Sequence, residues 1–498
     1  MWESVYGPST SDCRWIVTDE LDELLIVIAF NETNGECYTT TMSIFTIRPK
    51  DYVQTLTSDP EYKHLYGEIF TPFSIVDTML DMMDSSVFSN PSHTFMDGGA
   101  GTGYFTMALC WKLDTHLTPC MPDETQRRRH ILSHMVYMCE IRPENVLQLK
   151  KCFGTLANII EGDFLSYKER TFHYVIGNPP YNCNGIKKVP TNTTQTKSQD
   201  GVTIWYNFVR HSIELLKDQG ELLVIIPSLW MRPDKEHMYT YMTRHKLCKI
   251  KCLSNTETNK AFKGEAQTPT SMVQVRKTEN DYIVDLYDSS MQCYVPYTYQ
   301  PMEPIPVFGA SILRKIRRFQ PFKTLCVYKT NMPSRKASLS NVQDTAHPFE
   351  NVRTAVIADQ RHVRFIKEYS SIPLAYHGVK KLILAHKMYG FPYLDLEGNY
   401  GISNRDTYVI VSEDELYLKQ ICDFFKTKFA LYLLECTRYR MKYIEKHIFE
   451  LIPDVTYLND FPDTIHDTSL SQYFRLSDEE IHAIHTLHTK SYSFQYVE

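Results

Sequence analysis

Residues 173–181 read HYVIGNPPY, a short apolar run that ends in two successive prolines. The apolar part predicts a buried β-strand. Proline has no N–H for a sheet and holds φ near about −65°, so the strand must end at Pro179 and Pro180 and the chain must leave in an extended form. The strand end therefore presents a fixed carbonyl, an amide side chain (Asn178) and an aromatic ring (Tyr181). In open α/β sheets, ligands bind in the crevice beyond such strand ends.

A glycine-dense turn, MDGGAGTGYF at residues 96–105, lies upstream of this strand. It follows a short β-like segment and leads into an expected helix that begins at Tyr104. Glycines let the backbone approach a ligand closely, and the helix N-terminus supplies free N–H groups. The spacing is not the Gly-x-Gly-x-x-Gly of dinucleotide sites, because Asp97 leads the turn and only Gly101 and Gly103 bracket its end. The turn therefore suits a ligand with a ribose and a zwitterionic chain better than one with a pyrophosphate.

Two further β-like runs lead to acidic residues. Residues 135–139 lead to Glu140, and residues 157–160 lead to Asp163 and Phe164. An acid at the tip of the second strand of a βαβ unit is where ribose hydroxyls are usually bound. An acid followed by an aromatic residue can bond an adenine amino group and cover the ring. Each acid alone is more often a helix cap or a turn residue, but together, at consecutive strand ends, they indicate one ligand site.

The alternation of strands and helices continues beyond Tyr181. We expect a helix over 205–217, a strand over 221–226, a helix from about 234, and strands over 247–253 and 270–275. Six or seven strands that alternate with helices and end in a hairpin indicate a mostly parallel, doubly wound α/β sheet.

Length and composition indicate a globular protein of more than one domain, because 498 residues with 43% hydrophobic content can bury a sizeable core. The start of the chain has no basic n-region, and the longest early apolar stretch, 24–30, is too short to cross a bilayer, so we expect an intracellular, soluble protein. The 13 cysteines are odd in number and form no Cys-x-x-Cys pair, which argues against a disulfide framework and a zinc ribbon. We expect no metal site.

The charge is unevenly distributed along the chain. The net charge is −6, yet residues 301–446 hold 23 Lys and Arg against 14 Asp and Glu. A basic segment in an acidic protein favours a phosphate-facing surface, although solvated helix faces have the same composition. A second basic cluster, 127–129, lies in an insertion over 114–133. We interpret this insertion as a solvated loop, with a DNA phosphate contact as the alternative.

These stretches, in this order, resemble the gamma class of amino-methylating DNA methyltransferases, the adenine-N6 modification enzymes of restriction systems. The NPPY sequence at 178–181 matches the catalytic motif of that family, and the resemblance covers residues 64–280 motif by motif. It implies the class I S-adenosylmethionine-dependent methyltransferase fold, a Rossmann-like α/β sheet of seven strands, with a C-terminal α+β target-recognition domain. Two departures are Gly98-Gly99, where the family usually has Pro and a small residue, and the insertion before Glu140.

The resemblance also implies a role for each site residue. The catalytic residues would be Asn178, Pro179, Pro180 and Tyr181. The cofactor, S-adenosyl-L-methionine, would be bound by Phe70, Thr71, Pro72, Asp97, Gly99, Ala100, Gly101, Gly103, Glu140, Asp163, Phe164 and Asn178. Tyr181 and Phe262 would stack on the target base.

The chemistry of the target agrees with these roles. The exocyclic nitrogen of adenine is a poor nucleophile because its lone pair is delocalised into the ring. If the Asn178 side-chain oxygen and the Pro179 carbonyl each accept one N–H, the nitrogen can pyramidalise and aim its lone pair at the methyl sulfonium. The prolines hold the acceptor carbonyl in place before substrate arrives, which is electrostatic preorganisation. Asn178 also favours adenine, because cytosine-N4 enzymes of the same family have Ser or Asp there.

We therefore predict a site-specific DNA methyltransferase that transfers a methyl group from S-adenosylmethionine to N6 of an adenine flipped out of duplex DNA. Double-stranded DNA is the expected partner, no membrane is involved, and a monomer is favoured. The expected parts are an N-terminal extension (1–60), a catalytic domain (61–285), a target-recognition domain that binds DNA (286–455) and an acidic helical tail (456–498).

Two alternatives remain open on the sequence alone. The same Asn-Pro-Pro-Tyr motif occurs in methyltransferases that modify RNA or protein glutamine, although these seldom carry Phe-Thr-Pro or a large basic C-terminal domain. A non-catalytic DNA-binding relative of the methyltransferase fold is the second, and the intact Asn178 and Asp97 argue against it.

Overall fold

The computed structural model describes residues 13–18, 26–31, 37–41, 44–45, 65, 69–183, 202–264, 266, 268–289, 291–357, 362–386, 390–405, 407–440 and 443–487. The chain divides into two compact units. The first comprises residues 1–227, 244–249 and 256–281, and the second comprises 228–243, 250–255 and 282–498. The four parts expected from the sequence, with boundaries after residues 60, 285 and 455, stay a prediction.

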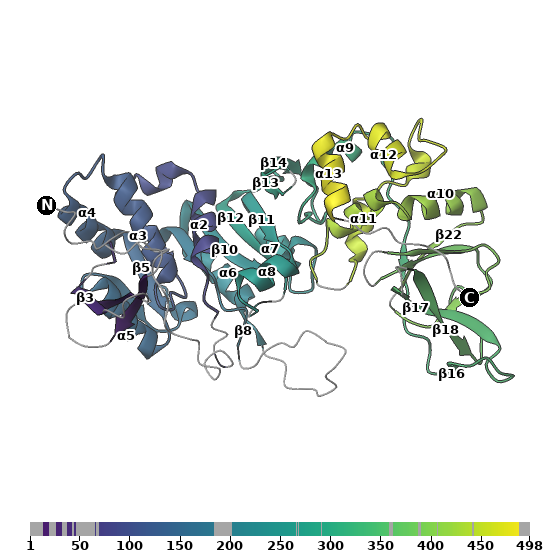
Figure 1. Cartoon of the computed structure of the whole chain (residues 1–498), viewed down its shortest axis with the longest axis horizontal. Helices are drawn as coiled ribbons and strands as arrows, with labels where there is room; N and C mark the ends of the chain where they lie inside the picture. The colour runs from purple at the N-terminus through teal and green to yellow at the C-terminus, as the bar shows by residue number, and fades with distance from the viewer. Residues whose placement is uncertain are drawn as a thin grey trace. The chain divides into compact units, whose positions relative to one another are not determined.

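A large mixed sheet carries the strands of the predicted α/β fold (Figure 1). Its order is β6-β5-β4-β7-β10-β12-β11-β13-β14. The bounds are β4 Phe95–Asp97, β5 Val136–Glu140, β6 Asn158–Glu161, β7 Phe172–Gly177, β10 Leu216–Pro227, β11 His245–Leu253, β12 Thr270–Glu279, β13 Ile283–Asp288 and β14 Cys293–Thr298. The predicted Rossmann-like sheet is confirmed, but it has nine strands instead of seven because β13 and β14 extend it.

The pairing directions place the strand ends that matter for a site on one edge. Strand β4 is parallel to both β5 and β7, β5 is parallel to β6, and β7 is parallel to β10. Strand β12 is antiparallel to β10. The middle of β10, Leu222 to Ile226, is a continuous buried apolar run, as expected for a strand covered on both faces.

The helices of this region connect the strands. They are α2 Phe73–Met82, α3 Tyr104–Leu117, α4 Glu124–His130, α5 Pro143–Phe153, α6 Trp205–Glu214, α7 Met238–Met242 and α8 Asn255–Ala261, with shorter turns η2 Ser85–Phe88, η3 Ile131–Met135, η4 Phe164–Ser166 and η5 Ser228–Met231. The short pairs β8 Asn182–Cys183 and β9 Val202–Thr203 form a two-stranded ladder. Strands β1 Cys13–Thr18, β2 Ile26–Asn31 and β3 Cys37–Thr41 form a separate antiparallel sheet.

Two helix boundaries differ from the sequence-based expectation. The helix expected over 205–217 ends at Glu214, because the chain enters β10 at Leu216. The helix expected from about 234 is only α7, whose N-cap is His237; Asp234 lies before the helix, and its carboxylate accepts a hydrogen bond from Tyr239 N at 2.9 Å.

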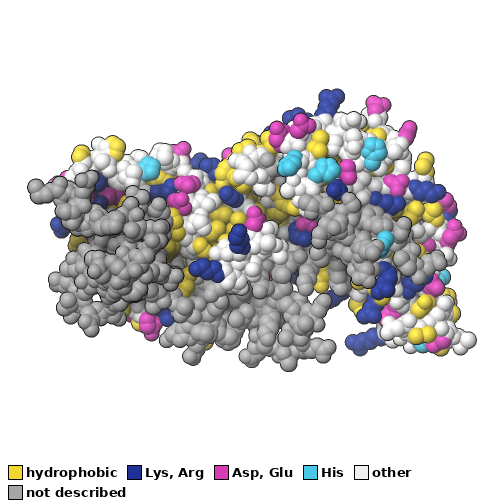
Figure 2. All heavy atoms as spheres, viewed as in Figure 1, with side chains coloured by type: hydrophobic (Ala, Val, Ile, Leu, Met, Phe, Trp, Pro, Cys, Tyr) yellow, Lys and Arg dark blue, Asp and Glu magenta, His cyan; other side chains and the backbone are white. Residues whose placement is uncertain are grey.

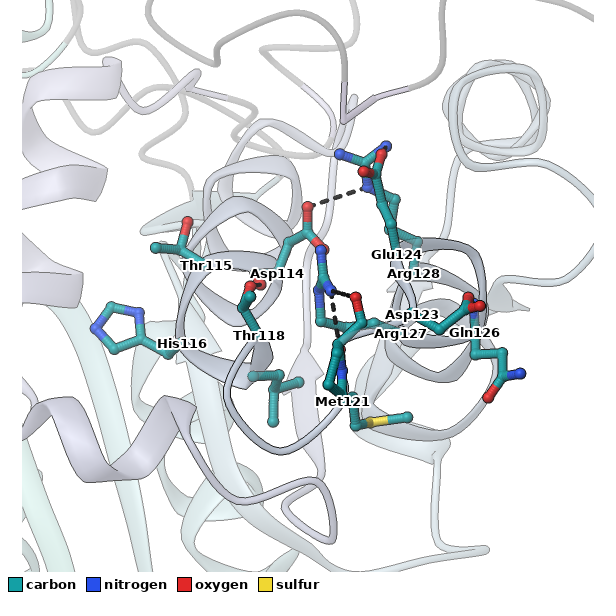
Figure 3. Close-up of polar contacts among 12 residues, drawn as sticks. Asp114, Thr115, His116, Thr118, Met121, Asp123, Glu124, Gln126, Arg127 and Arg128 are labelled. Carbon is teal, nitrogen blue, oxygen red and sulfur yellow. Dashed lines mark hydrogen bonds and ion pairs between the residues drawn. The ribbon is translucent and has the colours of Figure 1, made fainter.

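The insertion over 114–133 is helical, so its interpretation as a solvated loop was wrong. Helix α3 continues to Leu117, and α4 begins after Asp123, whose side chain accepts a hydrogen bond from Gln126 N at 2.8 Å. A π-helical turn, η3, then leads directly into β5. The polar residues that suggested a loop instead cap α4 and form ion pairs within the insertion (Figure 3).

The arginines of this insertion are held by the protein itself. Arg127 is only 6% exposed, and its Nε donates to the Oδ1 of Asp114 at 2.6 Å. Its Nη1 donates to the carbonyl of Met121 at 2.9 Å (Figure 3). Arg128 donates from Nε to the other oxygen of Asp114 at 3.0 Å and pairs with Glu124. Arg127 is therefore not available to a phosphate, and the alternative reading as a DNA contact fails for this residue.

The second unit has α+β composition, as predicted for the C-terminal part. One four-stranded sheet has the order β15-β22-β19-β20, and another has the order β16-β18-β17-β21. The strands are β15 Tyr328–Lys329, β16 Leu339–Ser340, β17 Phe349–Ile357, β18 Val363–Ser370, β19 Lys381–Ala385, β20 Pro392–Asp395, β21 Gly401–Ile402 and β22 Thr407–Val411. Besides α7 and η5, the helices of this unit are α9 Ala310–Ile316, α10 Glu415–Phe425, α11 Lys428–Glu435, α12 Asp467–Tyr473 and α13 Asp478–Leu487, with turns η7 Lys446–Glu450 and η8 Val455–Tyr457.

The basic residues of this unit fall into two groups. Some are internally paired, such as the fully buried Lys381, whose Nζ lies 2.5 Å from the carboxylate of Asp395. Others are exposed on or near β17 and β18: Arg335, Lys336, Arg353 and Arg364. Figure 2 shows Lys and Arg side chains gathered on the part of the surface where Figure 1 draws these strands. These exposed cations can face a ligand, and Arg353 also pairs with Glu368, with 3.8 Å between its Nη1 and the carboxylate.

No helix in the described parts of the chain is long and apolar enough to span a membrane.

Candidate functional site

A cavity of about 390 Å³ lies where β4, β5, β6 and β7 end. The predicted site residues that line it are Phe70, Thr71, Asp97, Gly99, Ala100, Gly101, Glu140, Asp163, Phe164, Asn178, Pro179, Pro180, Tyr181 and Phe262. The strand ends identified in the sequence thus converge on one cavity, within the volume range of small-molecule sites.

Two predicted site residues, Pro72 and Gly103, do not line the cavity. Pro72 is the N-cap of α2, and its carbonyl accepts from Ile75 N at 2.9 Å. Gly103 has a φ of +84°, and a Cβ there would lie 2.5 Å from the Phe153 ring and 2.7 Å from Leu149. Gly103 thus allows α3 to pack against α5.

The Glu140 side chain holds the glycine loop in place through a hydrogen bond. It is 6% exposed and ends β5. Its Oε2 accepts from the Gly101 N–H at 2.8 Å, and its Oε1 accepts from the Arg142 N–H at 2.9 Å. The loop is also tied to β5 by the Ala100 N–H, which donates to the Cys139 carbonyl at 3.1 Å. The Glu140 carboxylate is therefore held in a fixed position at the cavity wall. Its second role, which is to hold the glycine loop through the Gly101 N–H, cannot be read from its position in the sequence.

Asp97 is a buried carboxyl group whose pKa is strongly displaced. It is 2% exposed, and removal from water raises its pKa to about 7. The Thr106 hydroxyl, which donates to Oδ2 at 2.9 Å, and the Gly99 N–H oppose this rise, while the carboxylate of Glu140 adds to it. Because burial disfavours the charged form, a ligand cation beside Asp97 would restore it. The partner Thr106 was missed in the sequence, where it reads as an ordinary helix residue.

Asn178 is held at one end of its side-chain amide and free at the other. Its Nδ2 donates to the Thr71 hydroxyl oxygen at 3.0 Å. Its Oδ1 is buried and has no hydrogen-bond partner among the described residues. An unsatisfied buried acceptor is unfavourable by roughly 1–3 kcal/mol. A donor that enters the cavity would therefore form a hydrogen bond to the Asn178 Oδ1 with little competition from water.

Aromatic side chains complete the cavity wall. The Tyr181 hydroxyl donates to the Ile225 carbonyl at 3.3 Å, and burial raises the pKa of this hydroxyl. Phe262, directly after α8, is 3% exposed and lines the cavity together with Tyr181. Both rings predicted to stack on a base therefore border the same space as Asn178.

Phe164 lines the cavity, and most of its ring is packed inside the protein. It is 3% exposed and stacks on Phe208 of α6, with 5.7 Å between ring centroids and 24° between planes. A Cβ on Gly98 would lie 2.7 Å from the Phe164 ring, which explains glycine at this departure from the family pattern. Phe208 was missed by sequence reasoning, since it reads as part of a helix face. Ile141 was missed too, although an apolar residue directly after a strand-end acid is a usable signal; it is 47% exposed and lines the cavity.

Within the described residues, no group of three or more His, Cys, Asp or Glu is arranged to hold a metal ion. The cavity wall offers two buried acids, backbone amides, one unpaired amide oxygen and aromatic rings. Such a set can bind a cationic organic ligand and accept hydrogen bonds from an amino group.

Residues 121–262 match the family model described as Eco57I restriction-modification methylase. Type II methyltransferase M.BstVI of Geobacillus stearothermophilus is 28% identical over an alignment of 192 residues that covers 32% of this chain and 33% of that protein. Type II methyltransferase M.BsuBI of Bacillus subtilis is 26% identical over 187 residues, 34% of this chain and 36% of that protein. An uncharacterized adenine-specific methylase of Mycoplasma pneumoniae is 34% identical over 73 residues, 14% of this chain and 17% of that protein.

These matches confirm the predicted resemblance to adenine-specific restriction-modification methylases. The chain spans about a third or less of the length of these relatives. Among solved structures, the type I restriction enzyme EcoKI M protein has a TM-score of 0.33 at 18% identity, over 50% of this chain and 53% of that one. The type IIG restriction endonuclease BpuSI has a TM-score of 0.38 at 10% identity, over 86% of this chain and 66% of that one.

Proposed function

We propose that this protein methylates N6 of adenine in duplex DNA with S-adenosyl-L-methionine as methyl donor. The observation that carries the proposal is the buried, unpartnered Oδ1 of Asn178, which lines the same cavity as Asp97 and Glu140. One cavity thus joins an acceptor suited to an amino group with acids suited to a cationic nucleoside. The match of residues 121–262 to the methylase family model and the methyltransferases among the relatives support the choice of reaction.

The donor set fits the cofactor. Glu140 would accept hydrogen bonds from the ribose hydroxyls, and Asp97 would face the ammonium of the methionine moiety, which favours its charged form. Asp163 and Phe164 would contact the adenine, beside the glycine loop of Gly99, Ala100 and Gly101. The cofactor supplies an activated methyl group on a sulfonium.

On the substrate side, the Asn178 Oδ1 and the Pro179 carbonyl would each accept one N–H of the target amino group. This draws the nitrogen lone pair out of conjugation with the ring. The two prolines keep the acceptor carbonyl in place, and Tyr181 and Phe262 would hold the flipped base by stacking. Asn178 is the catalytic residue in this proposal, and the rings are binding residues.

Residues 286–455 are proposed to bind the DNA around the target base. The exposed cations Arg335, Lys336, Arg353 and Arg364 of the second unit support this, since phosphates attract such groups regardless of sequence. The charge pairs inside the unit, such as Lys381 with Asp395, contribute nothing to it.

The deciding experiment offers labelled S-adenosylmethionine and three acceptors: duplex DNA of mixed sequence, RNA, and protein with exposed glutamine. We expect label in DNA alone, and sequencing of the methylated DNA should show N6-methyladenine at one short motif. Label in RNA or protein and none in DNA would overturn the proposal. Cofactor binding without transfer to any acceptor would instead indicate a non-catalytic relative.

A further inference from the structure

We propose that Thr71 is a positioning residue for the reaction: its hydroxyl holds the Asn178 side-chain amide so that Oδ1 faces the target nitrogen. The inference rests on the proposed function and adds a residue to it. The resemblance had assigned Thr71 only to the cofactor.

The geometry places the hydroxyl directly on the amide. The Nδ2 of Asn178 donates to Oγ1 of Thr71 at 3.0 Å, and both residues line the cavity. The other end of the amide, Oδ1, is buried without a hydrogen-bond partner in the described chain. The bond to Thr71 is thus the one hydrogen bond recorded for this side chain among the described residues.

The backbone around Thr71 is anchored. Pro72 follows it with φ of −61° and ψ of 146° as the N-cap of α2. The Pro72 carbonyl accepts from the N–H groups of Ile75 at 2.9 Å and Val76 at 3.1 Å. Because the start of α2 is held by these hydrogen bonds, the Thr71 hydroxyl just before it has a fixed position from which to bind the Asn178 side chain at the end of β7.

The orientation of the amide matters because its two ends have similar shapes and opposite hydrogen-bonding characters. The target amino group has two N–H groups, so it requires an acceptor. A rotated amide would point its NH₂ at that group, and a tilted one would miss it. The Thr71 hydroxyl can accept or donate, and a bound adenine selects the state in which Oδ1 faces inward and Thr71 accepts. Anchoring Nδ2 then removes the rotation about the Cβ–Cγ bond that would otherwise spread Oδ1 over several positions.

The test compares Thr71→Val, which removes the hydroxyl at nearly constant shape, with Thr71→Ser, which keeps it, in the full chain. Wild type is first assayed on duplex DNA, and an absence of label in DNA would overturn the proposed function. The role of Thr71 is tested separately, by comparing the variants on whichever acceptor the wild type methylates. We expect Thr71→Val to lower the single-turnover rate about 10- to 100-fold, as small misplacements of reacting groups do. Thr71→Ser should restore most of the rate, and the cofactor Kd from calorimetry should change less than about threefold in both.

A double-mutant cycle supplies the second readout. If Thr71 acts through Asn178, Thr71→Val should have no further effect on the rate in an Asn178→Ala background. Equal effects in both backgrounds would overturn the inference, as would a weaker cofactor Kd with an unchanged rate. If Thr71→Val does not fold, as judged by its thermal unfolding, Thr71→Ala replaces it in the same cycle.

Discussion

Asn178 and Thr71 are 107 positions apart in the chain, yet the amide nitrogen of the first donates a 3.0 Å hydrogen bond to the hydroxyl of the second. This bond joins the end of β7 to the start of α2 at the wall of one cavity. The carboxamide oxygen is thereby left as a buried acceptor for a ligand.

Asn178→Ala should retain cofactor binding and lose methyl transfer by at least about 100-fold, the scale seen when one preorganised hydrogen-bonding group is removed from an active site. The reason is that the target nitrogen would lose its acceptor while the acids proposed to hold the cofactor, Asp97 and Glu140, would remain. Single-turnover methylation and calorimetry with the cofactor measure the two effects separately. Unchanged turnover would contradict the assignment of Asn178 as the acceptor for the target amino group.

Glu140→Ala should weaken cofactor affinity by about tenfold or more, because a charge-assisted hydrogen bond contributes roughly 1.5–3 kcal/mol. The loss of cofactor affinity should exceed that expected from the ribose contact alone, since the N–H groups of Gly101 and Arg142 also lose their acceptor. Calorimetry provides the Kd. The exposed Glu144, on α5, is a control: Glu144→Ala should bind the cofactor as wild type does, and an equal loss there would contradict the prediction.

Cofactor affinity should fall as the pH drops below about 7, where the free Asp97 carboxyl becomes protonated. The sign follows because, in the proposed site, the ammonium of the cofactor would bind the Asp97 carboxylate and not the neutral acid. Between pH 5 and about 7 the α-amino group of the cofactor stays protonated, so Asp97 dominates the titration, with a limiting slope of about tenfold per pH unit. Asp97→Asn should bind weakly with no such slope. A flat profile for wild type would contradict the role of Asp97.

Arg127→Ala should lower the free energy of unfolding by about 3 kcal/mol, the lower end of the range for breaking a buried ion pair. The lower end is expected because Arg128 still contacts the second oxygen of Asp114. Urea unfolding measures the change. The neighbouring Arg129 is exposed and offers a matched control, so Arg129→Ala should change stability by less than about 0.5 kcal/mol. Equal stability of the two variants would show that the Arg127 pair is dispensable.

Gly103→Ala should destabilise the fold by about 1–3 kcal/mol, since a methyl group would enter the space of Phe153 and Leu149 at a left-handed φ. Gly99→Ala meets no atom within 4 Å and is the control for stability within the same loop. Thermal unfolding without cofactor distinguishes the two. A wild-type midpoint for Gly103→Ala would mean that α3 and α5 can separate without loss.

Much of the site was predictable because its signals are local. A strand ends where two prolines follow Asn178, and acids or glycines directly after a buried run mark the cavity edge in any parallel sheet. The insertion over 114–133 was misread for the opposite reason. Its polar residues resemble a loop in composition, but Asp114 and Arg127 neutralise each other inside the fold, and composition does not reveal pairing.

The sequence by itself determined the α/β class, the strand ends that form the cavity and the residues that line most of it, because each depends on neighbours along the chain. Only the tertiary structure decided which end of the Asn178 amide is held by Thr71, that Thr106 opposes the rise in the pKa of Asp97, and that Gly103 faces a helix instead of the cavity. These depend on contacts between distant segments, whose distance and direction are set by the packing of the whole sheet and its helices.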